Sequence, residues 1–151
     1  MINELTQITT VGQIMTTKVI SVKPSDTMQV VSHFFRTHNI HHLPVVDKEG
    51  VLIGMISKSD YLAISNAFPL FYQDRREAFN DKIYGSLLVE EVMTKQLARL
   101  QPEDSILIAV GIFQENLFHA LPVVDEHNKL VGIITTYDLL SFAFRDQMFL
   151  S

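Results

Sequence analysis

The chain carries two copies of one segment, separated by 78 residues. Residues 14–62 and 92–140 align without a gap and are identical at 16 of 49 positions, and 12 further pairs are apolar in both copies. The sequence LPVVD at residues 43–47, for example, recurs at residues 121–125. Chance is a poor explanation for so long a register, so the chain is expected to fold as two similar units.

Each copy predicts the same order of elements. Residues 19–22 predict a short strand, after which Ser25 or Asp26 is expected to cap a helix. The second copy predicts its matching helix from Asp104 onward. A buried strand over 43–46, a polar turn ending in glycine, and a returning strand over 51–56 predict a hairpin, and a second helix follows. The fold class expected is α+β, with tandem β-α-β-β-α repeats.

Composition and charge narrow the functional classes. Hydrophobic residues make up 47% of the chain, enough to form a folded core, and the absence of cysteine excludes disulfides and thiol chemistry. The net charge of −5, without a basic cluster or a tryptophan, argues against a nucleic-acid partner. The first residues lack a signal-peptide pattern and no apolar run is long enough for a bilayer, so we expect a cytoplasmic protein that does not enter a membrane.

The segment between the copies mixes apolar and charged residues. We expect additional helices over 63–90, where Phe68, Leu70, Phe71 and Tyr72 suit core or dimer contacts better than a ligand site. The C-terminal residues Phe142, Phe144, Met148 and Phe149 suggest the same role. The boundaries expected are 10–66 for the first repeat, 67–86 for the helical segment between the repeats and 87–151 for the second repeat, within one compact module.

A polar step after each hairpin is the strongest candidate for a site. Ser57 and Asp60 in the first copy match Thr135 and Asp138 in the second. A hydroxyl and free backbone amides at a helix start favour an anion, and a carboxylate there can accept hydrogen bonds from ribose hydroxyls. The alternative is a purely structural cap, in which Ser57 or Thr135 is the N-cap and the aspartate is the first-turn acid.

The histidines raise the question of metal binding or catalysis. His38, His41 and His42 lie just before a buried strand, with His33 earlier on the preceding helix, but no carboxylate has the spacing that would complete a metal site. Solvated or pocket-lining histidines are the favoured interpretation. No nucleophile–base pair or phosphate-binding glycine loop is found, so the chain is not expected to be an enzyme.

These residues resemble the CBS domain family. The resemblance rests on the two matching stretches HHLPVVD…GMISKSD and HALPVVD…GIITTYD, and it covers about 14–62 and 92–140. It implies two repeats packed sheet to sheet as a pseudo-twofold pair, called a Bateman module, with a ligand cleft on each side. It also implies AMP, ADP, ATP or S-adenosylmethionine as a regulatory ligand rather than a catalytic cofactor, a homodimer, and a separate, unknown protein partner.

The family pattern also implies which residues line the two clefts. Asp138 is expected to hold a ribose, and the rest of its cleft is expected to comprise Met15, Thr16, Ile20, His119, Ala120, Ile133, Thr135 and Tyr137. The cleft around Asp60 is expected to comprise His41, His42, Met55, Ser57, Lys58, Ser59, Met93, Thr94 and Ala98.

The two clefts differ in charge. His41, His42 and Lys58 in the Asp60 cleft correspond to His119, Ala120 and Thr136 in the other. Cationic donors bind phosphate strongly, so the Asp60 cleft is expected to prefer phosphorylated nucleotides and the Asp138 cleft ligands with fewer phosphates or a cationic adenosyl group. Two other hypotheses remain open at this point, namely a structural dimerisation protein with vestigial clefts and a small enzyme that uses the histidine cluster.

Overall fold

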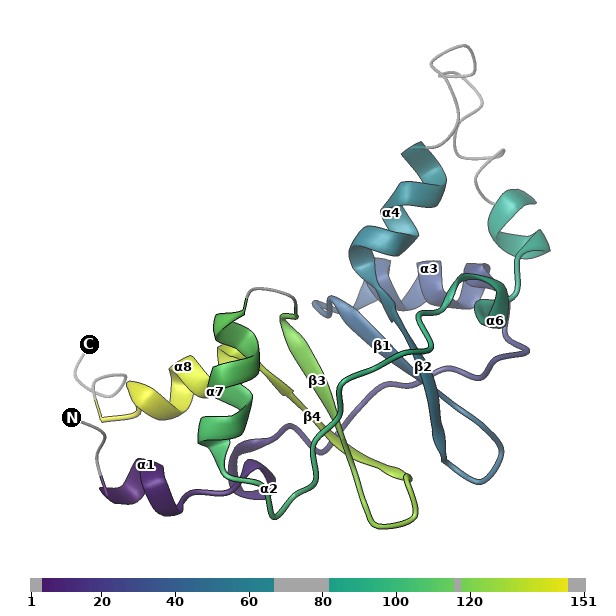
Figure 1. Ribbon diagram of the computed structural model, residues 1–151. Coiled ribbons are helices and arrows are strands. Elements are labelled where there is room, and N and C mark those ends of the chain that lie inside the picture. The colour runs from purple at the N-terminus through teal and green to yellow at the C-terminus, as the bar shows by residue number, and fades with distance from the viewer. Residues whose placement is uncertain (1–3, 67–81, 116–117, 147–151) are drawn as a thin grey trace. The chain divides into compact units, whose positions relative to one another are not determined.

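The computed structural model describes residues 4–66, 82–115 and 118–146, and its contacts divide the chain into two units (Figure 1). Residues 20–97 form one of them, here called the central unit. Residues 1–19 together with 98–151 form the other, here called the terminal unit. Both units combine helices with a hairpin, which confirms the α+β class expected from the sequence.

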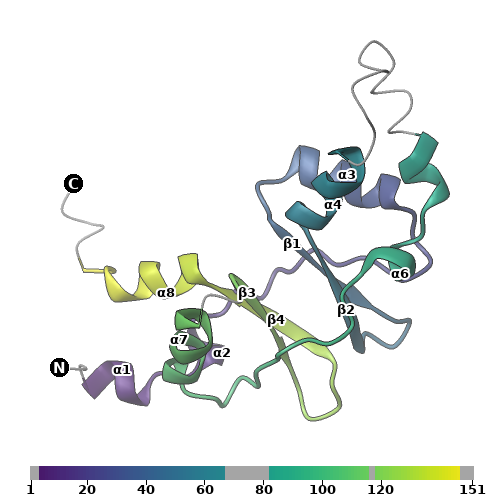
Figure 2. The same cartoon turned by 45° about the horizontal axis from the view of Figure 1, so that its top comes forward.

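The same elements recur in both units. The central unit contains α3 (Met28–Thr37), β1 (His42–Val46), β2 (Leu52–Ser57), α4 (Lys58–Asn66), helical residues 82–86 and α6 (Val89–Val92). The terminal unit contains α1 (Glu4–Ile8), α2 (Val11–Ile14), α7 (Ile106–Gln114), β3 (Ala120–Val124), β4 (Leu130–Thr135) and α8 (Thr136–Ala143). In each unit two helices contact each other beside the hairpin, α3 with α4 and α7 with α8 (Figures 1 and 2).

The two hairpins are alike in register and in turn. Each is antiparallel and each shifts register at the same place, between Val45 and Val46 in one and between Val123 and Val124 in the other. The turns place Gly50 (φ 85°) and Asn128 (φ 62°) at equivalent left-handed positions, which glycine and asparagine adopt most readily. The shared turn confirms the hairpin that the sequence predicts in each copy.

An equivalent carboxylate closes each turn, since Asp47 and Asp125 accept backbone N–H groups at matching places. The hydrogen bond from the Lys129 backbone N–H, above all, lowers the pKa of the exposed Asp125 carboxyl from its ordinary value. A lowered pKa favours the folded state when the carboxyl is ionised, so this contribution to stability is lost as the pH falls through the lowered value.

The leading segment of each copy joins the hairpin of the other copy. Thr16 pairs with Ile133 on β4, although Thr16 lies at the start of the first copy and Ile133 in the second. In the same way Thr94 pairs with Met55 on β2. The two units defined by contacts therefore have other boundaries than the expected repeats. Residues 10–19 belong to the terminal unit, and residues 87–97 belong to the central unit.

Two local expectations need correction. The strand expected over 19–22 is reduced to one parallel bridge, between Val22 and Val45. Thr27, rather than Ser25 or Asp26, occupies the N-cap position of α3, without a side-chain capping hydrogen bond among the described residues. The carboxylate of Asp26 instead accepts the Lys23 backbone N–H at 2.8 Å to close the preceding turn.

The matching helix in the second copy begins in the same way. Ser105 caps α7 by accepting the Leu107 N–H at 3.2 Å, while Asp104 accepts the Gln101 N–H at 2.8 Å. A turn comes before each helix because the short Asp side chain closes a local loop more readily than it reaches the helix amides two residues further on.

Each unit has its own hydrophobic core. In the central unit the helices and the hairpin enclose fully buried Met28, Val31, Leu43 and Ile56. In the terminal unit the corresponding positions include Ile106, Ala109, Leu121 and Ile134. The expected apolar faces are therefore buried, since 78 residues separate Met28 from Ile106, Val31 from Ala109, Leu43 from Leu121 and Ile56 from Ile134.

The segments expected to be helical between and after the repeats are only partly described. Residues 82–86 are helical, and Tyr84 stacks on Tyr61 at 5.0 Å between ring centroids. Phe68, Leu70, Phe71, Tyr72, Met148 and Phe149 lie outside the described residues. Phe142 packs against the terminal core, whereas Phe144 is exposed. Of the helices in the described parts of the chain, none combines the length and apolar character needed to cross a bilayer.

Candidate functional site

Both aspartates of the polar steps cap helices. The Thr135 hydroxyl accepts the Asp138 N–H at 3.1 Å, and Asp138 Oδ2 accepts the Thr135 N–H at 2.9 Å. The Ser57 hydroxyl accepts the Asp60 N–H at 3.1 Å, and Asp60 Oδ2 accepts the Ser57 N–H at 3.4 Å. Each pair forms a reciprocal capping box, so the capping role that the sequence allows is present at both places.

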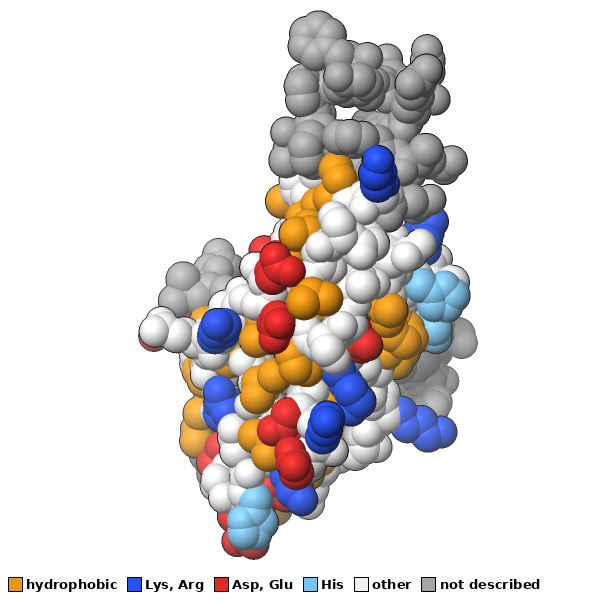
Figure 3. Space-filling model, turned by 90° about the vertical axis from the view of Figure 1, so that its right-hand side faces the viewer, with side chains coloured by type: hydrophobic (Ala, Val, Ile, Leu, Met, Phe, Trp, Pro, Cys, Tyr) orange, Lys and Arg blue, Asp and Glu red, His pale blue; other side chains and the backbone are white. Residues whose placement is uncertain are grey.

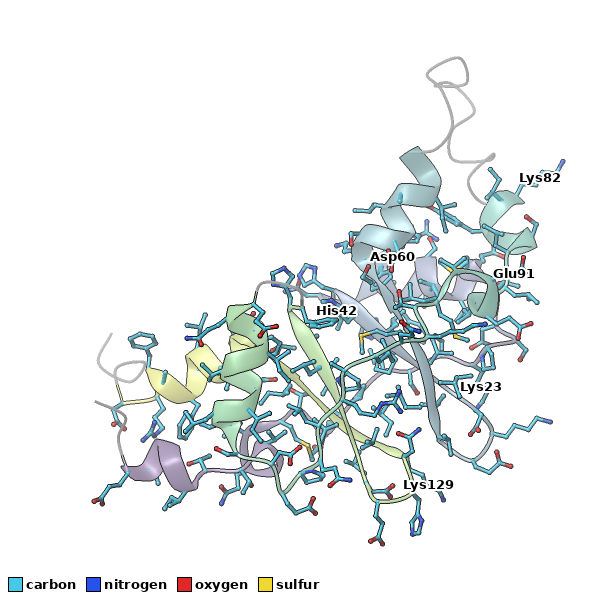
Figure 4. All side chains as sticks on the ribbon, in the orientation of Figure 1. Lys23, His42, Asp60, Lys82, Glu91 and Lys129 are labelled. Carbon is cyan, nitrogen blue, oxygen red and sulfur yellow. The ribbon has the colours of Figure 1, made fainter. Side chains whose placement is uncertain are left out.

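The capping aspartates keep hydrogen-bond acceptor capacity beyond the caps. In each box only one carboxylate oxygen, Oδ2, accepts the backbone N–H, and both side chains remain partly exposed at the start of their helices. Figure 4 shows Asp60 where β2 passes into α4. A carboxylate can accept about four hydrogen bonds, so a capping aspartate retains acceptor capacity for a ligand.

The leading segment brings Thr16 to Asp138. Two backbone hydrogen bonds, of 2.8 and 2.9 Å, join Thr16 to Ile133 on β4. From this position the Thr16 hydroxyl donates to Asp138 Oδ1 at 3.2 Å and lies 3.5 Å from Oδ2. Three residues expected in one site, namely Thr16, Ile133 and Asp138, are therefore brought together within the terminal unit.

The central unit repeats this arrangement without the side-chain hydrogen bond. Thr94 joins Met55 through backbone hydrogen bonds of 2.9 and 3.0 Å. In the part of the chain that the structure describes, however, no hydrogen bond links the Thr94 hydroxyl to Asp60. The two candidate sites thus share a backbone plan and differ in how the carboxylate is partnered.

A glycine on each returning strand admits a methionine. A Cβ atom placed on Gly132 would lie 2.5 Å from Met15 Sδ, and one placed on Gly54 would lie 2.5 Å from Met93 Sδ. Met15 and Met93 were expected to line the sites, and both cross the hairpins at these glycines. The glycines themselves were not predicted as part of the sites, although their presence at equivalent positions in both copies was a usable signal.

Substitution of Gly132 tests this contact. Gly132→Ala would force Met15 and the Thr16 carbonyl to move, and we expect it to lower the free energy of unfolding by about 1–3 kcal/mol. Gly111 in α7 is a matched control, because a Cβ there meets nothing within 4 Å and alanine should raise stability by about 0.5–1 kcal/mol. Urea unfolding followed by circular dichroism measures both, and a neutral Gly132→Ala would contradict the proposed contact.

The remaining expected residues lie near the starts of α4 and α8, either as neighbours in the sequence or as partners across the hairpins. Ala120 is buried and pairs with Thr135, and His42 is half-buried and pairs with Ser57. The carbonyls of His41 and His119 accept the backbone N–H groups of Lys58 and Thr136, at 2.8 and 3.3 Å. Ser59 contacts the Ser57 hydroxyl at 3.0 Å, whereas the Tyr137 side chain is 71% exposed.

Two expected residues fall in the opposite unit from their aspartate. Ile20 packs against the core of the central unit, and Ala98 packs against the core of the terminal unit. Neither residue therefore lies in the same unit as the aspartate of its expected site.

The histidines near the end of α3 make local contacts. The Phe34 ring lies between those of His33 and His38, with centroids 5.9 and 5.8 Å away, and the Thr37 hydroxyl lies 2.9 Å from His38 Nδ1. Among the described residues, no three His, Asp or Glu side chains are grouped so as to hold a metal ion.

Charge is dispersed around these sites. On the face that Figure 3 draws, lysine and arginine side chains alternate with aspartate, glutamate and hydrophobic ones, and the described side chains there form no continuous basic patch. The features that can bind a small polar molecule are therefore local, namely the hydroxyls, carboxylates and helix amides of the two capping boxes.

Comparison with protein families identifies both halves of the chain. The model of the CBS domain matches residues 11–66 and 89–145. The CBS domain-containing protein YhcV of Bacillus subtilis is 34% identical over 125 residues, which are 83% of this chain and 79% of YhcV. The matched ranges contain both hairpins and both capping boxes.

Other matches concern parts of larger proteins. The inosine-5'-monophosphate dehydrogenase of Methanocaldococcus jannaschii is 33% identical over 122 residues, which are 81% of this chain but 21% of the enzyme. The chain spans less than a quarter of the length of the first curated enzymes that it matches.

A solved structure matches almost end to end. CBSX2 from Arabidopsis thaliana, crystallised in complex with AMP, has a TM-score of 0.75 and 28% identity. The match covers 92% of this chain and 98% of that one.

Proposed function

This chain belongs to the CBS domain family as a tandem pair, and on that premise we propose that it is a regulatory module that binds adenosyl ligands and performs no catalysis. AMP, ADP, ATP and S-adenosylmethionine are the ligands considered. The observation that carries the proposal is the duplicated capping box, in which a carboxylate with spare acceptor capacity lies beside a hydroxyl and helix amides. The AMP complex of CBSX2 supports it, since that fold matches this chain over nearly its whole length.

In the proposed complex the aspartates accept hydrogen bonds from ribose. Asp60 and Asp138 use Oδ2 for the cap, so Oδ1 is the oxygen that a ribose hydroxyl would approach, and at Asp138 this oxygen already accepts the Thr16 hydroxyl. Ser57 and Thr135 each accept one backbone N–H, which leaves the hydroxyl hydrogen able to donate to a phosphate. The amides at the starts of α4 and α8 add a partial positive charge that favours an anion.

The proposal extends to a difference between the two sites. Lys58 begins α4, while its equivalent at the start of α8 is the neutral Thr136. His42 begins β1 and pairs with Ser57 at the end of β2, and His41 comes just before it. The equivalent residues of the other site are His119 and Ala120. The Asp60 site accordingly prefers phosphorylated nucleotides, and the Asp138 site prefers ligands with fewer phosphates or a cationic adenosyl group.

Titration of ATP and S-adenosylmethionine into the single variants tests the assignment. Asp60→Ala is expected to lose ATP affinity and to keep S-adenosylmethionine, and Asp138→Ala the reverse. Isothermal calorimetry on nucleotide-free protein gives both constants. Loss of ATP binding in Asp138→Ala alone would overturn the assignment of the two sites.

The proposal also includes a cytoplasmic location, a homodimer and a separate protein partner. Adenine nucleotides and S-adenosylmethionine are cytoplasmic metabolites, which supports the location. Tyr137, Leu140 and Phe144 are exposed on or next to α8, and apolar side chains of this kind suit a protein–protein contact. A structural dimerisation protein with unused sites is the alternative function that ligand titration discriminates.

A further inference from the structure

The two aspartates differ in the hydrogen bonds that they already make. Asp138 accepts from the Thr135 backbone at 2.9 Å through Oδ2 and from the Thr16 hydroxyl at 3.2 Å through Oδ1. Asp60 accepts only from the Ser57 backbone, at 3.4 Å through Oδ2, among the residues that the structure describes. One carboxylate therefore has both oxygens engaged, while the other has one oxygen free of described partners.

The difference does not follow from residue type. Thr94 is the equivalent of Thr16 in the 78-residue register, and each threonine pairs by its backbone with the returning strand of its unit. A threonine with the same backbone pairing therefore donates its hydroxyl to the aspartate in the terminal unit but not in the central unit.

This hydrogen bond bears on ligand affinity, an argument that rests on the proposed function. A ribose hydroxyl that donates to Asp138 Oδ1 must displace the Thr16 hydroxyl or share the oxygen with it. At Asp60 the same ribose displaces only water from the partly exposed oxygen, so the new hydrogen bond keeps its usual net contribution to binding. Breaking one hydrogen bond to form another gains little, whereas forming one with a charged, unpartnered oxygen gains more.

From these contacts we infer that Thr16 is a specificity-determining residue, which competes with the ribose for Asp138 and makes the nucleotide fill the Asp60 site first. The role is opposite in sign to that of a lining residue that binds the ligand. Removal of the Thr16 hydroxyl therefore strengthens binding at Asp138.

The test isolates the Asp138 site with Asp60→Ala and titrates AMP by calorimetry. Adding Thr16→Val, which keeps the shape and the backbone pairing of threonine, is expected to raise AMP affinity about three- to tenfold. Thr17→Val, at the exposed neighbouring residue, is the matched control and should leave the affinity unchanged. In an Asp138→Ala chain, Thr94→Val is expected to give no gain. Thermal melting of each variant shows whether it is folded.

The outcomes separate the inference from the proposed function. Weaker or unchanged AMP binding in Thr16→Val, or an equal gain from Thr94→Val, overturns the competing role while the proposed function stands. A wild-type chain that binds no AMP, ATP or S-adenosylmethionine at millimolar concentration overturns the proposed function itself and the inference with it.

Discussion

Replacement of Asp60 and Asp138 together by alanine is expected to weaken AMP binding at each site by about 10- to 100-fold. Each aspartate is proposed to accept a ribose hydroxyl, and a hydrogen bond to a charged group contributes about 1.5–3 kcal/mol. Because every tenfold in affinity corresponds to about 1.4 kcal/mol, the loss of such contacts at both sites removes most of the measurable affinity. Equilibrium dialysis with radiolabelled AMP measures the effect.

The double variant needs a control for structural damage, because both aspartates also cap helices. Asp26 and Asp104 provide it, since each accepts one backbone N–H at 2.8 Å in the equivalent turn of the two copies. Asp26→Ala with Asp104→Ala removes two carboxylates and two backbone hydrogen bonds away from the capping boxes. AMP affinity should survive this control, and a similar loss in both double variants would mean that general destabilisation explains the result.

Leu121→Ala is expected to lower the free energy of unfolding by about 2–5 kcal/mol. Leu121 is fully buried on β3, pairs with Ile134 and lies in the core of the terminal unit. The loss combines the transfer free energy of the removed methyl groups with the cost of the cavity left behind. Urea unfolding followed by circular dichroism measures the change.

The exposed Leu140 on α8 is the matched control, because its side chain is 59% accessible and alanine there should change stability by less than about 0.5 kcal/mol. A difference below about 1 kcal/mol between Leu121→Ala and Leu140→Ala would contradict the assigned core. If Leu140→Ala instead lowered the free energy of unfolding by much more than about 0.5 kcal/mol, the result would show that this surface is covered in the native assembly.

Much of the fold could be predicted from the internal repeat. The apolar run within LPVVD, the polar turn after it and the returning apolar run predict both hairpins, because these runs and turn residues such as Asp47 and Gly50 are local signals. The capping boxes at Ser57 and Thr135 were also predictable, as one of two open interpretations. Local hydrogen bonding between residues three apart decides these features, so sequence alone suffices.

The exchange of leading segments did not follow from local signals and was expected only through the resemblance to the CBS family, which grouped Thr16 with Asp138 and Thr94 with Asp60. Pairing of Thr16 with Ile133 joins residues 117 positions apart, and the register shows only that Thr16 and Thr94 are equivalent, not which hairpin each one joins. Close packing of Met15 on Gly132 accompanies this pairing, but Met93 packs on Gly54 in the same way, so this contact does not decide which hairpin each segment joins. The cap at Thr27 was missed because Asp26 satisfies a turn that competes for its carboxylate.

The AMP-binding isotherm of the nucleotide-free wild-type chain tests the central claim most directly. The account predicts saturable binding with unequal sites, in which the tighter site is lost in Asp60→Ala and the weaker one in Asp138→Ala. Absence of saturable binding by AMP, and equally by ATP and S-adenosylmethionine, would contradict it and favour a structural dimerisation protein.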